Sequence, residues 1–365
     1  MGYYPPVDSA IESPLEDRVS VSVVIPHRAG RNILMACLGS LDGSLPGGSE
    51  IIVVDTGCRD GSIDEAQENF PEIVIVDGGR GAGFSKGCNQ GIRRARSPWI
   101  LLLNDDAVLL PGCVDKLLQV GEKCPDIGAV QPKVLSAMAP ENFDAAGAAG
   151  GFIDRYGHPF ARGRLFHCVE QDRGQYDTEV DLFWGAGVCL LIRRKCLDQV
   201  GDLDESFFAH MEEIDFCWRM ALVGWRTVFA PEARILHVGG ATLARGSARK
   251  IYLNHRNGLW MMIKNLSARS LVRVLPFRAI LDLAAIAFHL FNGRPKIAAA
   301  VLVALGAAVI GLPQVITSRS GVQRQRTKSD GDLAHLVLPR SVAVAFFFRG
   351  IRSFDSLGWK VTEGP

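Results

Sequence analysis

The chain has 365 residues, 48% of them hydrophobic and 22% charged, which is enough apolar material for a large core and excludes wholesale disorder. The net charge of +1 conceals an asymmetry. Residues 1–263 hold 26 Lys and Arg against 34 Asp and Glu, whereas residues 264–328 hold 10 against one. An acidic body followed by one basic, apolar segment argues against a protein that wraps nucleic acid. The nine cysteines form no C-x-x-C pair, so neither a zinc site nor a disulfide framework is predicted.

Apolar runs alternate with helix-like stretches through the first third of the chain. The runs cover residues 19–26, 50–55, 72–77 and 99–105, and the helix-like stretches cover 32–41, 62–69 and 83–96. This alternation predicts βαβ units, and therefore an α/β fold with a mostly parallel sheet flanked by helices. The runs are almost pure β-formers, as expected for strands buried on both faces. Pro111 is predicted to open the next helix.

The second part of the chain has a different texture. Residues 140–180 are rich in Gly, Ala and Arg and are predicted to form loops and short strands over a site. Beyond them the pattern predicts strands at 183–192, 227–230 and 234–238, and helices at 195–200 and 212–223. From Ile251 the chain is predicted to be helical.

The apolar stretches near the C-terminus bear on membrane association. Ile280–Asn292 contains Asp282 and is too short to cross a bilayer, whereas Ile297–Ile316 has 20 residues without a charge. The apolar piece at 342–348 has no assignment from its pattern.

Polar residues follow the predicted strands where ligands bind in open parallel sheets. They are His27, Asp55, Asp77 and the run Asn104-Asp105-Asp106. Asp77 is predicted to cap a helix, and Asp60 is the predicted cap in the loop after Asp55. Two adjacent carboxylates at a strand end repel each other unless a cation compensates, so Asp105-Asp106 predicts a divalent metal.

Five blocks in order carry a resemblance to a known family. VSVVIPHR, IIVVDTGCRDGS, GRGAGFSKGCNQGI and WILLLNDDAVL resemble the family 2 inverting glycosyltransferases, which have the GT-A fold. The later block from FWGAGVCLL to ILHVGG is similar to their rhamnosyltransferase and galactofuranosyltransferase branch. The resemblance implies a catalytic domain over residues 19–265, preceded by an N-terminal extension at 1–18. A helical membrane-associating region would follow at 266–328, and a tail of unknown role at 329–365.

The resemblance implies a nucleotide-diphosphate sugar donor and a Mg²⁺ or Mn²⁺ ion. Asp106 matches the last acid of the family's D-x-D motif and would bind the metal, together with His237. Asn104 replaces the first acid of that motif. The residues that would contact the nucleotide sugar are Pro26, His27, Asp55, Gly83, Asn104 and Asp105.

Glu212-Glu213-Ile214-Asp215 matches the family's E-D-x-D block, in which the second acid is the general base. Glu213 would therefore take the proton of the acceptor hydroxyl, with Glu212 and Asp215 as rival candidates. Asp215 is also expected to pair with Arg219 at i+4. Trp184 and Gly185 would form the wall under the acceptor, although Trp184 has a core position as its equal alternative.

The same residues bear on other functions of an α/β protein. GGRGAGFSKG has glycines at nearly the spacing of a dinucleotide fingerprint, but it follows the third predicted strand, which disfavours a dehydrogenase. The glycine-rich signature of nucleotidyltransferases and the Q-x-x-R-W motif of processive synthases are absent from the sequence. A non-catalytic, membrane-tethered nucleotide-sugar-binding protein would keep the fold without Asp106 and Glu213.

Residues 269–319 alternate cations with apolar helical stretches, which predicts helices lying on an anionic membrane surface. In this family branch the acceptor is often a polyprenyl-linked glycan of the cell envelope or of a surface polysaccharide. The expected location is therefore the cytoplasmic face of the plasma membrane, as a peripheral or monotopic protein. A single span over 297–316 is the alternative.

Overall fold

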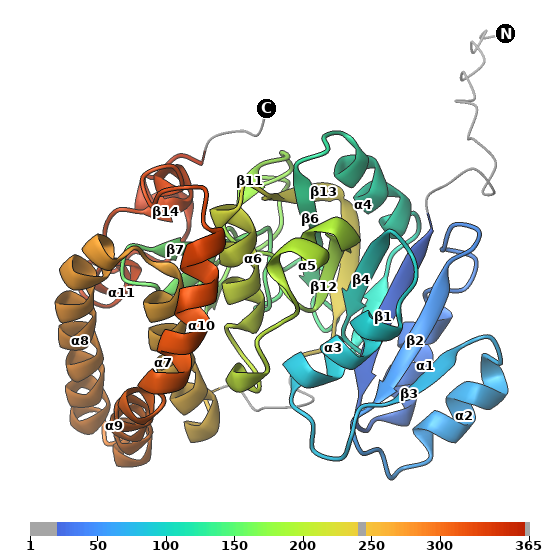
Figure 1. Ribbon diagram of the computed structural model, residues 1–365, viewed down its shortest axis with the longest axis horizontal. Helices are drawn as coiled ribbons and strands as arrows, with labels where there is room; N and C mark the ends of the chain where they lie inside the picture. The colour runs from blue at the N-terminus through green and yellow to red at the C-terminus, as the bar shows by residue number, and fades with distance from the viewer. Residues whose placement is uncertain (1–19, 240–245, 362–365) are drawn as a thin grey trace, which may run out of the picture.

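A nine-stranded sheet runs through the middle of the described chain, with helices on both faces (Figure 1). The computed structural model describes residues 20–239 and 246–361, so the predicted extension at 1–18 lies outside it. The strands of this sheet are β1 (Val21–His27), β2 (Glu50–Asp55), β3 (Val74–Asp77), β4 (Trp99–Leu103), β5 (Ala107–Leu109), β6 (Ile127–Ser136), β11 (Asp181–Leu182), β12 (Cys189–Arg193) and β13 (Arg226–His237). Their order is β11-β13-β6-β12-β4-β1-β2-β3, and β5 pairs with β13.

The strand directions confirm the predicted parallel pairing of the first strands and correct the prediction of a mostly parallel sheet. β1 is parallel to β2 and β4, and β2 is parallel to β3, as the βαβ pattern predicts. β12, however, lies antiparallel between β4 and β6. The sheet as a whole is therefore mixed rather than mostly parallel.

Both faces of the sheet are covered. The helices are α1 (Arg31–Gly39), α2 (Ser62–Asn69), α3 (Phe84–Arg94), α4 (Cys113–Glu122), α5 (Arg194–Val200) and α6 (Glu212–Leu222). Within β1, Val23 and Ile25 pack in the core that includes α1, α2 and α4, whereas Val24 packs in the core that includes α3, α5 and α6. This alternation confirms that the runs of β1, β2 and β4 are strands buried on both sides, whereas β3, at the edge of the sheet, is only partly buried.

Three predicted boundaries are wrong. α4 begins at Cys113 rather than at Pro111, because Gly112 lies between them with φ of +73°. The predicted strand 183–192 is interrupted between β11 and β12, where a Cβ on Gly185 would lie 2.4 Å from Leu190 Cδ1. The predicted strands 227–230 and 234–238 are one strand, β13, with an irregularity between Ala230 and Arg234.

A smaller sheet contains the segment predicted as short strands. Its members are β7 (Gly151–Asp154), β8 (Pro159–Ala161), β9 (Arg164–Leu165), β10 (Cys168–Val169) and β14 (Val337–Leu338), in the order β10-β9-β8-β7-β14. β14 comes from the tail, so this segment of previously unknown role completes the smaller sheet. The tail continues into α11 (Val342–Phe347), and Phe354 and Trp359 pack against Phe152 of β7.

Four helices form the end of the molecule opposite β3 (Figure 1). They are α7 (Ala248–Asn265), α8 (Ala268–Phe291), α9 (Pro295–Ile310) and α10 (Leu312–Gln325). The uncharged run 297–316 is broken at Gly311, where a Cβ would lie 2.3 Å from the Trp260 ring. Within the described residues, no single helix has the length and apolar composition of a membrane span. The pair α9 and α10 meets that criterion together, bent by 63°.

Candidate active site

The ends of β1, β2 and β3 lie side by side at one edge of the sheet. The register pairs His27 with Asp55 and Asp55 with Asp77. Asn104 follows β4, which pairs with the opposite side of β1. The structure therefore gathers the strand-end residues at one edge, as parallel pairing requires.

His27 connects two of these strand ends. Its ring is buried, and Nδ1 lies 2.7 Å from Asp105 Oδ2 while Nε2 lies 2.6 Å from Ser62 Oγ. Burial raises the pKa of Asp105 above its usual value, although the hydrogen bond with His27 acts in the opposite direction. Pro26 packs toward α3, since a Cβ on Gly87 would lie 3.2 Å from Pro26 Cβ.

The acids of the β2 and β3 loops hold their own backbone turns. Asp55 Oδ1 accepts hydrogen bonds from the amides of Gly57 and Cys58, at 2.8 and 2.7 Å. Asp77 accepts one from Gly79. Asp60 accepts a hydrogen bond from the amide of Ser62, the first residue of α2, but the N-cap residue is Gly61, so the predicted cap lies one residue too early. Asp60 also forms, with His27 and Cys58, a group whose possible metal-ligand atoms lie within 4.8 Å of one another. Its carboxylate, however, already accepts hydrogen bonds from Ser62 and from the Gly30 amide.

Asp106, His237 and Asp144 form a buried row. His237 Nε2 lies 3.1 Å from Asp106 Oδ1, and His237 Nδ1 lies 2.8 Å from Asp144 Oδ1. All three side chains are buried. Burial disfavours the imidazolium, but the two carboxylates outweigh it and raise the pKa of His237 to about 9. Sequence analysis missed Asp144, because it is 93 residues from its partner in a stretch without a clear period.

These residues fit a divalent cation. Asp106 Oδ1 is buried, and it has no hydrogen bond of good geometry within the described residues. Carboxylate oxygens together with an imidazole are suitable ligands for Mn²⁺, and carboxylate oxygens alone suit Mg²⁺. Ligation requires the neutral imidazole, so His237 would give up its proton on binding, and Asp106 and His237 would then hold the predicted metal.

Two further acids stand at the start of α6. Glu212 is buried and Glu213 is partly buried, and each has one buried oxygen without a hydrogen-bond partner among the described residues. Burial raises the pKa of Glu213 to about 7, against the opposite effects of a backbone hydrogen bond and of the Lys250 charge. Burial and the charge of Glu213 raise the pKa of Glu212 well above its usual value. The pair can therefore hold and release a proton near neutral pH.

Asp215 has a different environment. It is fully buried, and Arg219 donates to it as the i+4 spacing predicts, at 2.9 Å. Asn265 of α7 donates to its other oxygen at 2.8 Å, and Lys264 Nζ lies 2.7 Å away. Both carboxylate oxygens are thus engaged in joining α6 to α7.

Glu213 faces the same sheet edge as the Asn104-Asp105-Asp106 run. β12 is antiparallel to β4, so Cys189 pairs with Leu103 and the residues just before β12 lie at the end of β4. The Asn104 amide donates to the Val188 carbonyl at 2.9 Å. A Cβ on the neighbouring Gly187 would lie 3.9 Å from Glu213 Cβ. The two groups of acids therefore converge on one side of the sheet.

A strained segment leads into Glu212. Phe208, His210 and Met211 have φ of +67°, +68° and +74°, a left-handed conformation that non-glycine residues rarely adopt. Asn257 of α7 is fully buried, and its amide nitrogen donates to the carbonyls of Phe207, Ala209 and His210 at 3.0, 3.0 and 2.7 Å. Arg256 also donates to the Phe207 carbonyl, at 3.1 Å, so two neighbouring side chains of α7 hold the turn that positions the start of α6, and Asn257 holds most of its carbonyls.

Asn257→Ala is expected to lower the free energy of unfolding by about 2–3 kcal/mol, because buried carbonyls lose their donor in a strained turn. Urea denaturation measures this change. Asn69→Ala is the matched control, since the Asn69 amide donates an exposed hydrogen bond to the Glu65 carbonyl within α2 and its removal should cost less than about 1 kcal/mol. Equal losses in the two variants would show that Asn257 does not hold the turn.

The remaining predicted residues lie around this turn and behind it. Gly83 precedes α3, and a Cβ there would lie 2.3 Å from the Phe208 carbonyl oxygen, so glycine allows α3 to pack on the turn. Trp184 is buried, its indole donates to the Phe152 carbonyl, and its ring fills the space where a Cβ of Gly151 would lie. This environment favours the core alternative for Trp184. Gly185 follows it in the break between β11 and β12.

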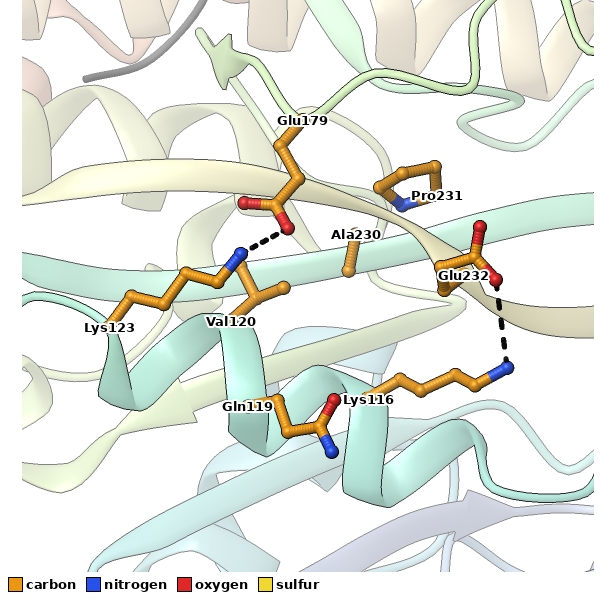
Figure 2. Close-up of a pocket in the computed structure, with 8 residues that line it drawn as sticks. All are labelled: Lys116, Gln119, Val120, Lys123, Glu179, Ala230, Pro231 and Glu232. Carbon is orange, nitrogen blue, oxygen red and sulfur yellow. Dashed lines mark hydrogen bonds and ion pairs between the residues drawn. The ribbon is translucent and has the colours of Figure 1, made fainter. Parts of the chain in front are cut away.

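A separate shallow hollow lies between α4 and β13 (Figure 2). Ion pairs join Lys123 to Glu179 and Lys116 to Glu232 across it. None of the predicted site residues lines this hollow, which is lined by Lys116, Gln119, Val120, Lys123, Glu179, Ala230, Pro231 and Glu232.

Comparisons with known proteins agree with this geometry. The chain is 27% identical over 222 residues to an N-acetylglucosaminyl-diphospho-decaprenol L-rhamnosyltransferase of Mycobacterium tuberculosis, an alignment that covers 57% of this chain and 72% of the relative. It is 22% identical over 201 residues to a galactofuranosyl glycosyltransferase of Leishmania donovani, covering 48% of this chain and 46% of the relative.

A solved structure of GalNAc-T7 with UDP, GalNAc and Mn²⁺ superposes with a TM-score of 0.55 at 17% identity. The match covers 68% of this chain and about half, 48%, of that one, and it shows a shared GT-A fold. The family model described as glycosyltransferase like family 2 matches residues 18–257, which is more than half of the chain. The chain therefore belongs to glycosyltransferase family 2.

Proposed function

We propose that the chain is an inverting, metal-dependent glycosyltransferase that moves a sugar from a nucleotide-diphosphate donor to a hydroxyl of a lipid-linked glycan. The observation that carries this proposal is the convergence of two acid groups at one sheet edge. Asp106 and His237 provide metal ligands there, and Glu213 provides a base with a pKa near 7. Both groups are required when a diphosphate leaves as a hydroxyl attacks.

The donor would lie across the ends of β1, β2 and β4. Asp55 is fixed by two backbone amides and would accept hydrogen bonds from the base, while Pro26 and His27 would lie beneath the nucleotide. His27 also holds Asp105, which connects the nucleotide pocket to the metal ligands. Asn104 would reach the ribose.

Asp106 and His237 would hold Mg²⁺ or Mn²⁺. When bound, the ion supplies positive charge that stabilises the departing diphosphate. Asp144 would keep His237 oriented, since a second carboxylate on the far nitrogen fixes the ring and its tautomer.

Glu213 would accept the proton of the attacking hydroxyl. Its partial burial keeps its pKa near the working pH, which suits a general base, and its place on α6 faces the metal ligands. Glu212 is more buried, and burial together with the charge of Glu213 raises its own pKa well above the usual value, so Glu212 would stay protonated beside the base. Because one carboxylate deprotonates the acceptor and no residue replaces the leaving group first, the anomeric configuration would invert.

The relative from Mycobacterium tuberculosis is named for a decaprenol-linked substrate, which supports a polyprenyl-linked acceptor for this chain. Such an acceptor belongs to cell-envelope or surface-polysaccharide synthesis, and it would place the enzyme at the cytoplasmic face of the plasma membrane. The donor sugar would be a rhamnose or a hexose.

Asp144→Asn is expected to weaken Mn²⁺ binding by about 10–100-fold, because the ring of His237 loses the carboxylate that orients it. Isothermal titration with Mn²⁺ measures this directly, without any turnover. Asp154→Asn is the matched control: Asp154 is also buried, and it lies 3.3 Å from the Nδ1 of His158 in the smaller sheet. Unchanged Mn²⁺ affinity in Asp144→Asn would remove Asp144 from the site.

A panel of nucleotide-sugar donors tests the proposed function as a whole. Release of nucleoside diphosphate is measured with and without Mn²⁺ or Mg²⁺, in the presence of membrane-extracted lipid acceptor. We expect release with one donor that depends on both the metal and the acceptor, and inverted configuration in the product. Donor binding without release under any condition would instead indicate the non-catalytic sugar-binding alternative.

A further inference from the structure

The middle of α8 buries its charged residues and exposes its large apolar ones, which is the reverse of the usual amphipathic surface helix. Its two charged residues, Arg278 and Asp282, are buried, with exposures of 2% and 0%. They pair with each other at 3.0 Å; Arg278 also donates to the Tyr156 carbonyl, and His255 of α7 lies 2.9 Å from Asp282. In the middle of α8, the side that faces the protein therefore carries the ion pair, whereas Leu271, Val274 and Leu275 pack on the core nearer its start.

The outward side of α8 carries only uncharged, mostly apolar residues between Val274 and Gly293. The large exposed ones are Phe277, Ile280, Leu283, Phe288, Leu290 and Phe291. A helix that buries its ion pair and exposes this many large apolar side chains is not adapted to water on that face.

α9 continues the same surface beside α8, with which it is in contact. No charged residue occurs between Ile297 and Ser318. Ala298, Val301, Ala304 and Ala308 form its buried side, whereas four of its large apolar side chains are exposed. The exposed ones are Leu302, Val303, Val309 and Ile310.

α11 brings the tail to this surface. The Phe347 ring lies 5.3 Å from the Phe288 ring of α8, and the next residue, Phe348, is 81% exposed. The exposed apolar side chains of α8, α9 and residues 347–348 are called the outer helical face below.

Positive charge accompanies this face. Arg269 and Arg273 are exposed near the start of α8, and Arg294 and Lys296 are exposed in the turn between α8 and α9. Asp282 is the only acidic residue of 264–328, and it is buried. Cations beside an apolar surface are complementary to an anionic lipid bilayer, whose headgroups lie above its acyl chains.

We propose that the outer helical face inserts into the interfacial layer of an anionic membrane, with α8 and α9 lying along its surface. This inference rests on the proposed function for its purpose, since a lipid-linked acceptor must reach the site from a bilayer. α7 provides the connection: its His255 contacts Asp282 of α8, and its Asn257 holds the turn before Glu212. α7 therefore connects the proposed membrane-binding helix α8 with the turn before Glu212 in the active site.

Vesicle flotation tests the proposal with the full chain and without donor or acceptor. We expect binding to vesicles of phosphatidylglycerol and phosphatidylethanolamine, weaker binding to phosphatidylcholine, and loss of binding as salt screens the cations. The double variant Phe291→Asp, Ile310→Asp should bind the anionic vesicles at least about tenfold more weakly, because two exposed apolar anchors become charged.

Met138→Asp is the matched control, since Met138 is 83% exposed and lies outside the outer helical face. It should float like the wild type, and circular dichroism should show that all three proteins keep their helix content. Equal flotation of the double variant and the wild type would overturn the proposal. So would a wild-type dimer that does not bind vesicles and that the double variant dissociates in sedimentation velocity, because the face would then join two copies of the chain.

The proposed transfer reaction and the proposed membrane site can be disproved independently of each other. Flotation requires no sugar transfer, so a failed donor panel leaves the membrane result unchanged. Conversely, an enzyme that turns over a water-soluble acceptor without binding vesicles would keep the transfer reaction and lose only the outer helical face as a membrane site.

Discussion

Glu213→Gln is expected to lower kcat by ~10²–10⁴ while leaving donor affinity almost unchanged. The amide nearly preserves the size of the side chain but cannot accept the proton of the attacking hydroxyl. Glu213 lies at the start of α6, facing the Asn104-Asp105-Asp106 edge, and it has a buried oxygen without a partner among the described residues. Turnover and donor affinity, measured side by side, separate loss of the base from loss of binding.

The pH profile provides a second readout of the same variant. Because burial raises the pKa of Glu213 to about 7 and the base must be ionised, wild-type kcat should rise with pH until about 7 and then level off. Glu213→Gln should lose this rise. Glu212→Gln and Asp215→Asn are the comparison variants, and Asp215→Asn should act mainly on stability, since its partners are Arg219, Lys264 and Asn265. If Glu212→Gln abolished the rise while Glu213→Gln retained it, the base would be Glu212.

Asp106→Asn is expected to remove about 3–4 kcal/mol of transition-state stabilisation, or ~10²–10³ in rate, because the diphosphate would leave without the full charge of the metal. The substitution keeps the shape of a buried side chain beside His237, so the fold should survive. Mn²⁺ titration and turnover measure the two effects, and EDTA should reduce the wild type to a similar rate.

Asp77→Asn is the control for Asp106→Asn. Asp77 also ends a strand at the same sheet edge. Within the described residues, however, its carboxylate accepts a hydrogen bond from the Gly79 amide in its own turn. It should leave metal affinity and turnover close to those of the wild type. Full activity of Asp106→Asn in the presence of EDTA would exclude the metal from the mechanism.

The local pattern of apolar residues predicts the strands and helices whose sequences have a simple period. β1, β2 and β4 are predictable because strands buried on both faces are nearly pure runs of Val, Ile and Leu, and the edge strand β3 has the same composition although it is only partly buried. The predicted bounds of α2 are the observed ones. The break at 183–188 was not predicted, because it results from the pairing of β11 with β13 and of β12 with β4. The direction of β12 has the same cause, since a strand's sequence does not specify its neighbour.

The site residues also divide into those that a sequence motif predicts and those that only the fold reveals. Residues within a recognisable block, such as Asp106 and Glu213, could be named from the sequence. Asn257 and Asp144 could not, because each acts on a segment 47 to 93 residues away and neither lies in a motif. The inverted pattern of α8 could have been suspected from the i+4 spacing of Arg278 and Asp282 within an apolar run, but only the fold shows which side faces the protein.

The pairing of β14 with β7 has a consequence for the order in which the chain folds. Val337 pairs with Ile153, the Val342 amide donates to Asp154, and the Phe354 amide donates to Glu170, all across more than 180 residues. Contacts of such long range form late, so the smaller sheet cannot close on a ribosome until residues 337–354 have been made. Until then one edge of β7 is unpaired and open to association with other nascent chains. Residues 337–354 thus complete, during biogenesis, a sheet whose other strands were synthesised more than 150 residues earlier.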